Sequence, residues 1–355
     1  MHVAIDSVIN LWYPHGGIAK YFREVQRRLP ALGIDVEVIT YRGLTGVGDC
    51  SSVTNVINAG NFRQTVAVPR VFERYRKCAV GIHDSDIFHS SYYRLPQKFD
   101  GAVVTTVHDF IYERFAVGPR KWTHVAQKRR AVMGSNGIIC VSRATHSDLL
   151  RFIPEARDIP CEVIHNGIDI SPLLSADSMG SDIVSPFALF VGGRTGYKNF
   201  ALAVEACAEV EKLHLFVVGG GPLAPAQRSL LELRLRGRYQ YLGYVTDEEL
   251  KRLYRAAYCL IYPSSFEGFG IPVLEAMAQG CPVVCLRIPS IEEIAGDVVL
   301  FCSDPTTHSL VVQLRRLLDP DLRDFLVKSG AKHARQFSWD ATAERTSSFY
   351  KHIAE

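Results

Sequence analysis

The chain has 355 residues, of which 47% are hydrophobic and 22% are charged, and its formal net charge is +3. This length favours two domains over one, and the composition is typical of a globular protein. The small net charge gives no argument for nucleic-acid binding. The nine cysteines form no C-x-x-C pair and no Cys/His ligand spacing, so we predict a reducing compartment and no structural zinc.

No part of the sequence indicates a segment that crosses a membrane. The first residues, MHVAIDSV, lack a basic region followed by a long apolar core, and they are typical of a strand. No apolar run approaches the ~20 residues of a membrane span. We therefore predict a cytoplasmic protein, with peripheral binding to the inner face of the plasma membrane as the alternative.

Strand-like and helix-like segments alternate along the chain, which favours parallel sheets covered by helices. Residues 43–61 carry the least structural signal, and residues 171–185 are polar and aperiodic. We place an interdomain linker in that second stretch, between a domain of residues 1–170 and a domain of residues 171–338. The clearest predicted strands are residues 2–6, 35–40, 102–107, 137–141, 187–191, 213–218, 239–245 and 259–262.

Several helix starts are predicted from capping residues. A polar side chain before a helix accepts a hydrogen bond from an unpaired N–H of the first turn. Thr246 with Glu249 and Ser290 with Glu293 have the spacing of a capping box. Single capping residues are Ser142 and Asn199.

The most informative stretch is residues 262–284, which read YPSSFEGFGIPVLEAMAQGCPVV. An apolar strand ends at Pro263, a glycine-spaced loop follows, and Pro272 suits the first turn of a helix. A strand, a glycine loop and a helix N-terminus form an anion site, because unpaired N–H groups and the helix dipole converge there.

Two carboxylates, Glu267 and Glu275, frame this predicted anion site. A carboxylate would repel a phosphate, so we expect both to face the hydroxyl groups of a sugar or ribose. The alternative is a structural loop with two solvated glutamates, and the dense spacing of Gly268 and Gly270 argues against it.

This stretch resembles the E-x7-E signature of the retaining glycosyltransferases of family 4, with FEGFGIPVLEAMAQGCPV matching nearly throughout. The resemblance extends over essentially the whole chain. It implies an α/β protein of GT-B fold, with two Rossmann-like doubly wound domains facing a central cleft. It also implies that a C-terminal helix, residues 339–355, crosses back to the N-terminal, acceptor-binding domain. The C-terminal domain would hold a nucleotide diphosphate sugar as donor, without a cofactor or metal.

A glycine-rich turn, GGRTGYKN, follows the predicted strand 187–191 and resembles the family's donor-phosphate motif. Arg194 and Lys198 are four residues apart, so the turn could direct both toward one pocket. A diphosphate leaving group needs its growing charge neutralised, and two cations can do this without a metal. The alternative is a solvated Arg and Lys on a surface loop.

His108 ends the predicted strand 102–107, at the edge where parallel sheets place functional groups. The resemblance implies that it contacts the transferred sugar and supports positive charge at the anomeric carbon. A merely packed histidine is the alternative. We predict that Asp109 caps the next segment. Gly16 and Gly17 open a helix whose N–H groups would meet the donor phosphates.

Two further segments complete the predicted donor site. Residues 219–221 are three glycines, where the family more often has a polar residue between two glycines. Residues 243–245 resemble the segment that holds the nucleotide base through backbone groups. The predicted catalytic residues are His108, Arg194, Lys198 and Glu267, and the predicted donor-binding residues are Gly16, Gly17, Gly193, Arg194, Lys198, Gly243, Tyr244, Val245, Glu267, Gly268, Phe269, Gly270, Ile271 and Glu275.

Two basic stretches lie in the first half of the chain. They could dock on anionic lipid headgroups, although a solvated face is the favoured interpretation. Their members are Arg63, Arg70, Arg74, Arg76 and Lys77 in the first, and Arg120, Lys121, Lys128, Arg129 and Arg130 in the second.

We therefore predict a retaining, metal-independent hexosyltransferase that uses a hydroxyl of a glycan or lipid-linked acceptor. The GGIxxY and V-H-D-F segments resemble bacterial mannosyltransferases of surface-polysaccharide synthesis, which makes GDP-mannose the first choice of donor. The resemblance suggests front-face attack, with the leaving phosphate accepting the acceptor's proton. The alternatives are a GT-B epimerase or phosphorylase, and a non-catalytic regulatory protein that binds nucleotide sugars.

Overall fold

A computed structural model describes residues 1–40, 55–58, 75–78, 85–170, 185–194 and 196–355. The chain forms two compact units. Unit 1 comprises Met1–Gly167 with Ser338–Glu355, and unit 2 comprises Ile168–Phe337. The predicted linker, except Ser185, lies outside the described residues, as do Arg63, Arg70 and Arg74 of the first basic stretch and most of the stretch 43–61.

The sheet of unit 1 has seven described strands, all parallel, in the order β3-β2-β1-β4-β5-β6-β7. The central strands are mostly apolar because helices bury both of their faces, and their polar members His89, Thr105 and Thr106 are buried as well. Val3 of β1 pairs with Val36 on one side and with Ile87 on the other. The strands are β1 (His2–Asp6), β2 (Asp35–Thr40), β3 (Asn55–Asn58), β4 (Ile87–Ser90), β5 (Ala102–Val107), β6 (Gly137–Cys140) and β7 (Cys161–Val163).

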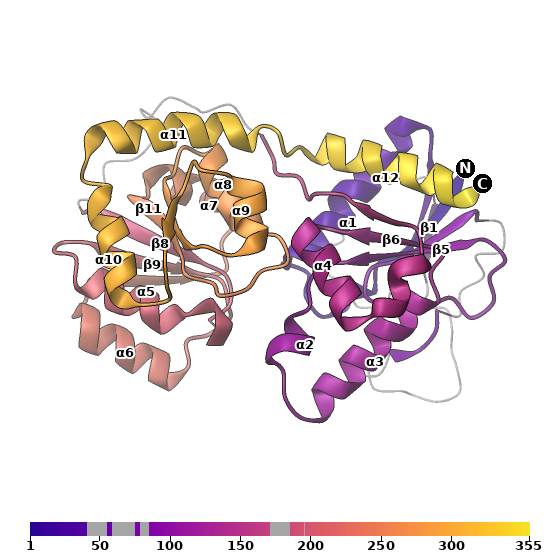
Figure 1. Ribbon diagram of the computed structural model, residues 1–355, viewed down its shortest axis with the longest axis horizontal. Helices are drawn as coiled ribbons and strands as arrows, with labels where there is room; N and C mark the ends of the chain where they lie inside the picture. The colour runs from indigo at the N-terminus through magenta and orange to yellow at the C-terminus, as the bar shows by residue number, and fades with distance from the viewer. Residues whose placement is uncertain (41–54, 59–74, 79–84, 171–184, 195) are drawn as a thin grey trace. The chain divides into compact units, whose positions relative to one another are not determined.

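Helices cover both faces of this sheet, with α1 and α12 on one side and α3 and α4 on the other (Figure 1). The side chain of Ser142 accepts a hydrogen bond from the N–H of Thr145, so the predicted cap of α4 is confirmed. The helices are α1 (Gly17–Arg28), α2 (Ile111–Phe115), α3 (Pro119–Met133), α4 (Arg143–Phe152) and α12 (Trp339–Ala354), with short 3-10 turns at Val8–Leu11, Leu29–Leu32 and Pro154–Asp158.

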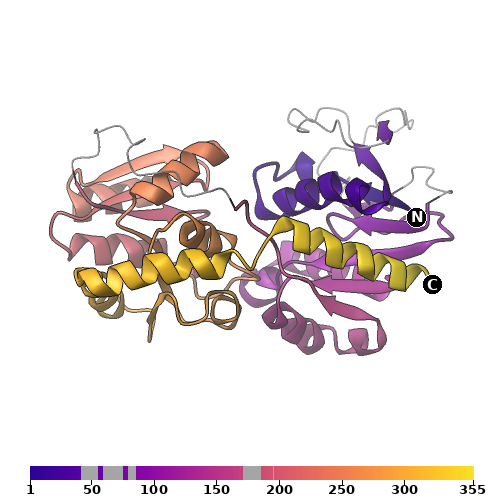
Figure 2. The ribbon, with the colours of Figure 1, turned by 90° about the horizontal axis from the view of Figure 1, so that it is seen from above.

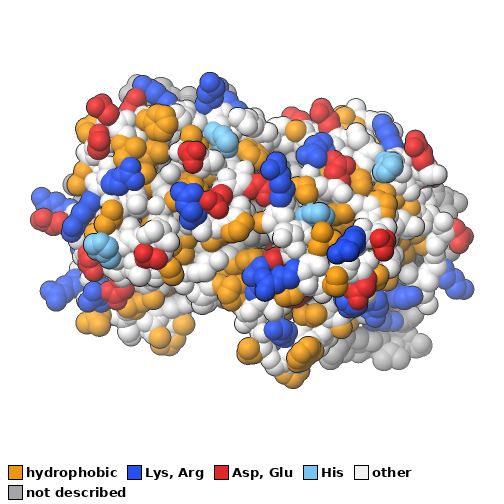
Figure 3. All heavy atoms as spheres, in the orientation of Figure 1, with side chains coloured by type: hydrophobic (Ala, Val, Ile, Leu, Met, Phe, Trp, Pro, Cys, Tyr) orange, Lys and Arg blue, Asp and Glu red, His pale blue; other side chains and the backbone are white. Residues whose placement is uncertain are grey.

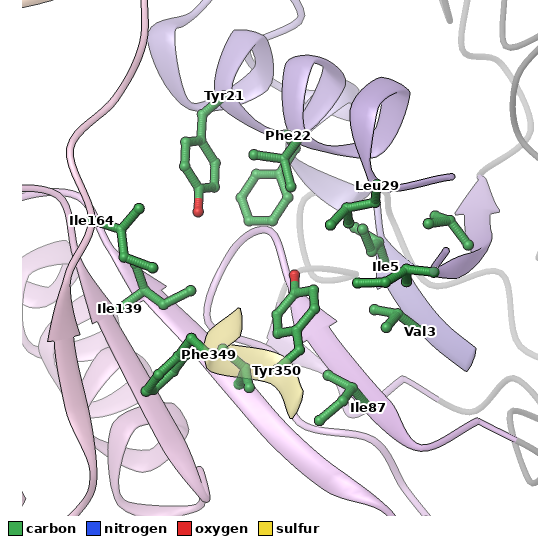
Figure 4. Close-up of a cluster of buried hydrophobic side chains, with 14 of the residues drawn as sticks. Val3, Ile5, Tyr21, Phe22, Leu29, Ile87, Ile139, Ile164, Phe349 and Tyr350 are labelled. Atoms are coloured by element: carbon green, nitrogen blue, oxygen red, sulfur yellow. The ribbon is translucent and has the colours of Figure 1, made fainter. Parts of the chain in front are cut away.

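The last helix, α12, completes the core of unit 1. Figure 2 shows it lying along this unit, and Figure 4 shows Phe349 and Tyr350 among the side chains of α1 and the central strands. Trp339 and Tyr350 are fully buried in the same cluster. A side chain added at Gly137 of β6 would collide with Ile353 and Phe349, so this glycine lets the helix approach the sheet.

Unit 2 repeats the same topology, and its described residues form six parallel strands in the order β10-β9-β8-β11-β12-β13. Phe187, Ala188 and Leu189 of the central strand β8 are fully buried. The strands are β8 (Phe187–Val191), β9 (His214–Val218), β10 (Tyr239–Gly243), β11 (Cys259–Tyr262), β12 (Val283–Leu286) and β13 (Leu300–Cys302).

The helices of unit 2 also lie on both faces of its sheet, α5 and α6 on one side and α8 on the other (Figure 1). The capping box of Thr246 and Glu249 forms as predicted. The predicted box at Ser290 is wrong, because α9 begins at Pro289 and its N-cap is Ile288. The helices are α5 (Phe200–Ala208), α6 (Pro225–Leu235), α7 (Asp247–Ala256), α8 (Ile271–Ala278), α9 (Pro289–Ala295), α10 (Thr307–Arg316) and α11 (Pro320–Ala334), with a 3-10 turn at Gly196–Lys198.

Both strand orders are those of a Rossmann-like, doubly wound sheet, in which the order reverses beside the first strand. The predicted α/β class with two Rossmann-like units is confirmed. In such sheets, ligands bind beyond the carboxyl ends of the two strands at which the order reverses. These strands are β1 and β4 in unit 1, and β8 and β11 in unit 2.

Three further observations concern cysteines, metals and membranes. The cysteines of the described ranges are free thiols. Within those ranges, no cluster of three or more His, Cys, Asp or Glu side chains could hold a metal ion. The described helices include none that is both long enough and apolar enough to cross a bilayer.

Candidate active site

An ion pair lies at the point of strand-order reversal in unit 2. Lys198 follows β8 and Glu267 follows β11, and these strands are neighbours in the sheet. The Nζ atom of Lys198 donates a hydrogen bond to Oε1 of Glu267 at 2.5 Å. Both side chains are mostly buried, at 14% and 10% exposure. The structure therefore brings together two of the four predicted catalytic residues.

Tyr262, the last residue of β11, lies against this pair. Its hydroxyl oxygen is 3.4 Å from Nζ of Lys198, and the ammonium lies 5.3 Å from the centre of its ring. Burial first, and then the neighbouring carboxylate of Glu267, raise the pKa of Tyr262 well above its ordinary value. The hydroxyl therefore stays protonated and donates to Glu267, which holds the carboxylate from a second direction.

The two loops that carry the ion pair are also joined directly. The side-chain amide of Asn199 donates to the carbonyl oxygen of Pro263 at 2.8 Å and to the hydroxyl of Ser265 at 2.7 Å. The N–H of Ser265 donates to the carbonyl oxygen of Tyr197 at 2.8 Å. Asn199 is the N-cap of α5 by position, but its side chain makes no capping hydrogen bond. The predicted N-cap position is therefore correct, but the predicted capping hydrogen bond does not form, because this amide ties the loops together instead.

The glycine loop after β11 leads into α8 through Gly270. This residue has a φ of 116°, a backbone conformation that favours glycine. A side chain there would also meet Ile291 of α9 at 2.3 Å. The close approach lets the start of α8 pack against α9, with Pro272 in its first turn. The predicted donor-binding residues Gly268, Phe269 and Ile271 occupy this same turn, and Phe269 is buried.

Glu275 lies within α8 and has a different partner from Glu267. The hydroxyl of Tyr254, a buried residue of α7, donates to its Oε2 at 3.4 Å. Burial first, and then the charge of Glu275, raise the pKa of Tyr254. The two glutamates of the E-x7-E pattern are thus held by two different tyrosines, Tyr262 at the end of β11 and Tyr254 on α7.

Arg194 takes a different position from the one expected of a phosphate-binding cation. Its guanidinium donates to the carbonyl oxygens of Gly219, Gly220, Gly221 and Pro222 at 2.5–3.1 Å. A side chain at Gly220 would come within 2.6 Å of this guanidinium. Gly220, the middle glycine of the three, stands where the family more often has a polar residue, and it therefore leaves room for Arg194 to fix the turn after β9. In this structure the arginine stabilises a loop, and its role toward a phosphate stays a prediction.

The segment predicted to hold the nucleotide base follows β10. The carbonyl oxygen of Gly243 accepts a hydrogen bond from the N–H of Gly219 at 2.6 Å, which ties this segment to the turn held by Arg194. Tyr244 is exposed and Val245 is half-buried. Gly193 lies beside Arg194 in the turn after β8, with open space where a side chain would stand.

In unit 1, the predicted glycines stand at the start of α1. Gly16 is the N-cap of this helix and Gly17 is its first residue. A 3-10 turn, Val8–Leu11, separates them from β1. The helix α1 therefore begins beyond the carboxyl end of β1, where the strand order of the sheet reverses, and the contact of its first N–H groups with the donor phosphates stays a prediction.

His108 directly follows β5 and is almost completely buried, with 9% exposure. The rings of Tyr21 and Phe22 pack against its imidazole, with centroids 5.1 Å and 6.1 Å away. Burial first, and then the positive charge of Lys128, lower the pKa of His108 to about 3. Its Nε2 atom is buried and has no hydrogen-bond partner among the described residues. A neutral imidazole with one unused nitrogen can donate or accept one further hydrogen bond.

A buried polar chain runs through the core beside His108. His89 of β4 makes hydrogen bonds to the hydroxyl of Tyr350 and, at 2.8 Å, to that of Thr106, which lies 3.3 Å from the hydroxyl of Tyr21. Burial first, and then His108, lower the pKa of His89 to about 3. Figure 4 shows both tyrosine hydroxyls pointing into the cluster. The chain links α12, β4, β5 and α1.

The second basic stretch is not one surface, so that prediction needs correction. Lys128 is fully buried and paired with Glu113. Arg129 is exposed and pairs with Glu155 at 2.5 Å, and Arg130 donates to the carbonyl oxygen of Tyr75 at 3.3 Å. Arg120 is exposed and Lys121 is half-buried. The helix places Lys128 on the same face as the buried Ala131 and Val132, so the helical period, had it been applied to this stretch, would have indicated an inward position.

Two Rossmann-like units, each with polar groups beyond the carboxyl ends of its central strands, are the architecture of the GT-B fold. Solved structures share this fold over nearly the whole chain. A sucrose-phosphate synthase from Thermosynechococcus elongatus has a TM-score of 0.80, with 20% identity over 99% of both chains. HepE of Anabaena, in complex with UDP-glucose, has a TM-score of 0.73, with 16% identity over 99% of this chain and 100% of that one.

Two family models match the sequence. The model of Glycosyltransferase Family 4 matches residues 15–172, and the model of Glycosyl transferases group 1 matches residues 180–333. An O-antigen chain mannosyltransferase B of Escherichia coli is 27% identical over 96% of this chain and 97% of its own length. The chain belongs to the GT-B glycosyltransferases that combine these two domains.

Proposed function

We propose that this protein is a retaining hexosyltransferase that transfers mannose from GDP-mannose to a hydroxyl of a glycan or lipid-linked acceptor. The Lys198–Glu267 pair at the strand-order reversal of unit 2 carries the proposal. It sets a cation and a carboxylate side by side, next to glycine loops that allow close approach of a ligand. The similarity to a mannosyltransferase of Escherichia coli supports mannose as the sugar.

In the proposed reaction, the bond between the anomeric carbon and the β-phosphate oxygen breaks as the acceptor oxygen bonds to the same face of that carbon. The proton of the acceptor hydroxyl passes to the departing phosphate oxygen. Lys198 would neutralise the charge that grows on the diphosphate. Glu267 would hold the sugar hydroxyls, and His108 would support the anomeric carbon as a neutral hydrogen-bonding group.

The proposal needs neither a cofactor nor a metal, because Lys198 and the start of α8 supply the positive potential. Turnover should be unchanged by EDTA. A strict requirement for a divalent ion would overturn this part of the proposal.

A thermal-shift screen across nucleotide sugars tests the donor. GDP-mannose should raise the melting temperature more than UDP-, ADP- or TDP-sugars, because ligands that bind only the folded state stabilise it by mass action. Mass spectrometry of products with an added glycan acceptor should then show a gain of one hexose. A changed sugar without transfer would indicate an epimerase, a sugar phosphate would indicate a phosphorylase, and binding without any product would indicate a regulatory protein.

For a lipid-linked acceptor, we propose peripheral binding to an anionic membrane through the end of unit 1 formed by α2 and α3. Phe115, Val117 and Trp122 are exposed there, beside Arg120 and Lys121. No Asp or Glu occurs between Glu113 and Asp148 in the sequence. Figure 3, in the orientation of Figure 1, shows hydrophobic side chains with Lys and Arg over this end of the unit. Exposed apolar groups next to basic ones are typical of interfacial binding.

A further inference from the structure

Lys128 is a cation that the proposed reaction does not use, and it is one of the largest fully buried side chains of the described structure. It lies on α3, and its Nζ atom donates to the carbonyl oxygen of Asp109 at 2.7 Å and to Oε2 of Glu113 at 2.8 Å. The ammonium also lies 4.4 Å from the centre of the Phe110 ring. Every one of these partners lies in the segment that directly follows His108.

The inner face of α3 also holds the segment that follows β4. The side-chain amide of Gln127 donates to the carbonyl oxygens of Tyr92 and Tyr93 at 3.3 Å and 3.4 Å. The hydroxyl of Tyr93 in turn accepts a hydrogen bond from the backbone N–H of His108. The N–H of His108 is thus held by Tyr93, and the carbonyl group of the next residue, Asp109, is held by Lys128. Both contacts depend on α3, because Gln127 and Lys128 belong to this helix.

A buried ion pair is a poor way to gain stability. Removing two charges from water costs about as much as their attraction returns, and well-packed apolar residues often stabilise a core equally well. Lys128 does supply two things that an apolar side chain cannot. It makes two directed hydrogen bonds to residues 109–113, and it places a positive charge beside the imidazole of His108.

We propose that Lys128 is a positioning residue of the sugar-transfer site, which fixes the His108–Glu113 segment and with it the place of the His108 imidazole. The inference rests on the proposed function for the role of His108, while the geometry of the segment is independent of it. Asp109 supports the same segment, since its side chain accepts from the N–H of Ile111 at 3.0 Å. The charged group nearest to this ammonium is Glu113, which balances its charge.

The test compares three full-length variants. Lys128→Met with Glu113→Gln removes the ion pair without leaving a lone buried charge, and Glu113→Gln alone separates the carboxylate's contribution. The matched control is Arg129→Met, the same chemical change at the next residue of α3, where the side chain is exposed and pairs with Glu155. Thermal melting establishes that each variant is folded before kinetics are measured.

Two readouts are required together. In the double variant, kcat should fall at least about tenfold, while binding of GDP, measured by direct titration, should change less than twofold because unit 2 holds the nucleotide. The NMR ring signals of His108, assigned with a His108→Gln variant, should move, and the pKa of His108 should rise because the nearby positive charge is lost. Arg129→Met should change neither quantity.

Unchanged kcat in a folded double variant overturns the inference, whether or not the His108 signals move. A lower kcat with unmoved His108 signals also overturns it, because the loss would then not act through this imidazole. If the wild-type protein transfers no sugar from any donor, the proposed function fails. The His108 signals of the double variant then still decide whether Lys128 holds the segment.

Discussion

Unit 1 holds its candidate residues with other side chains of its core, whereas unit 2 holds them with loops that extend beyond its sheet. His108 packs against two rings of α1 and lies beside the buried chain that includes His89 and Tyr350. Lys198 and Glu267 contact each other from two loops tied by Asn199. Substitutions in unit 1 should therefore affect stability and function together, while those in unit 2 should mainly affect function.

The largest expected effect is at Lys198, and it tests the unit 2 side of this comparison. Lys198→Ala should lower kcat about 100- to 1000-fold, or about 3–4 kcal/mol, because the leaving diphosphate loses its cation. The unfolding free energy should fall by only about 1–2 kcal/mol, since Glu267 keeps the hydroxyl of Tyr262 as a partner. Steady-state kinetics and urea unfolding measure the two quantities.

Lys328→Ala is the matched control, because this lysine is exposed and pairs with Asp324 on the surface of the same unit. Its turnover should equal that of the wild type. Near-normal turnover in Lys198→Ala would show that Lys198 is not a catalytic residue.

Acid should destabilise unit 1 selectively. The pKa values of His89 and His108 are lowered to about 3 in the folded protein by burial, whereas an unfolded histidine has a pKa of about 6.5. Their contribution to stability is complete above pH ~6.5 and is lost as the pH falls toward 3. Between pH 7 and pH 5, each histidine should cost about 2 kcal/mol of unfolding free energy.

Tryptophan fluorescence can follow this loss, because Trp12, Trp122 and Trp339 all belong to unit 1. His89→Gln should reduce the pH dependence of the unfolding free energy by the contribution of one histidine. His352→Gln, at an exposed position of α12, should leave it unchanged. A unit 1 transition that does not depend on pH between 5 and 7 would contradict the buried neutral state of both rings.

The two glutamates of the E-x7-E pattern should separate binding from chemistry within unit 2. Glu275→Ala should raise the donor KM about tenfold, or ~1.4 kcal/mol, if Glu275 makes the predicted hydrogen bonds to the ribose in both the ground and the transition state. Glu267→Gln should instead lower kcat and leave the donor Kd nearly unchanged. Steady-state kinetics with direct donor titration on both variants test this assignment. Equal effects of the two substitutions on donor binding alone would show that Glu267 is not the catalytic carboxylate.

The smallest expected effect concerns the exposed end of unit 1. Lys121→Gln should weaken binding to vesicles with anionic lipid about fivefold, because one basic residue near such a surface contributes about 1 kcal/mol. Arg129→Gln should weaken it less, since Arg129 already pairs with Glu155. Co-sedimentation with anionic and neutral vesicles measures the difference. Equal binding to anionic and neutral vesicles would show that Lys121 is a solvated surface residue that does not bind lipid headgroups.

The sequence was sufficient to predict the parallel sheets, because apolar strands alternate with amphipathic helices. It also placed Lys198 and Glu267 in loops that follow predicted strands, and the structure added that these two strands are neighbours. The position of Arg194 could not be predicted, since it depends on four carbonyl oxygens that converge only in the folded turn. Lys128 was missed because composition groups it with its basic neighbours. The 3.6-residue period of the helix, applied to α3, would have predicted that Lys128 points toward the core.

The position of α12 in unit 1 has a consequence for how the chain folds. Residues 338–355 follow all of unit 2, so unit 2 is an insertion within the sequence of unit 1. Its first and last residues are joined by a hydrogen bond from the N–H of Ile168 to the carbonyl oxygen of Phe337 at 3.0 Å. A folded insertion whose ends meet acts as a short loop, which makes the entropic cost of closing unit 1 around it small. During synthesis, unit 2 can thus reach its final structure first, and unit 1 closes its core only when Trp339 and Tyr350 arrive.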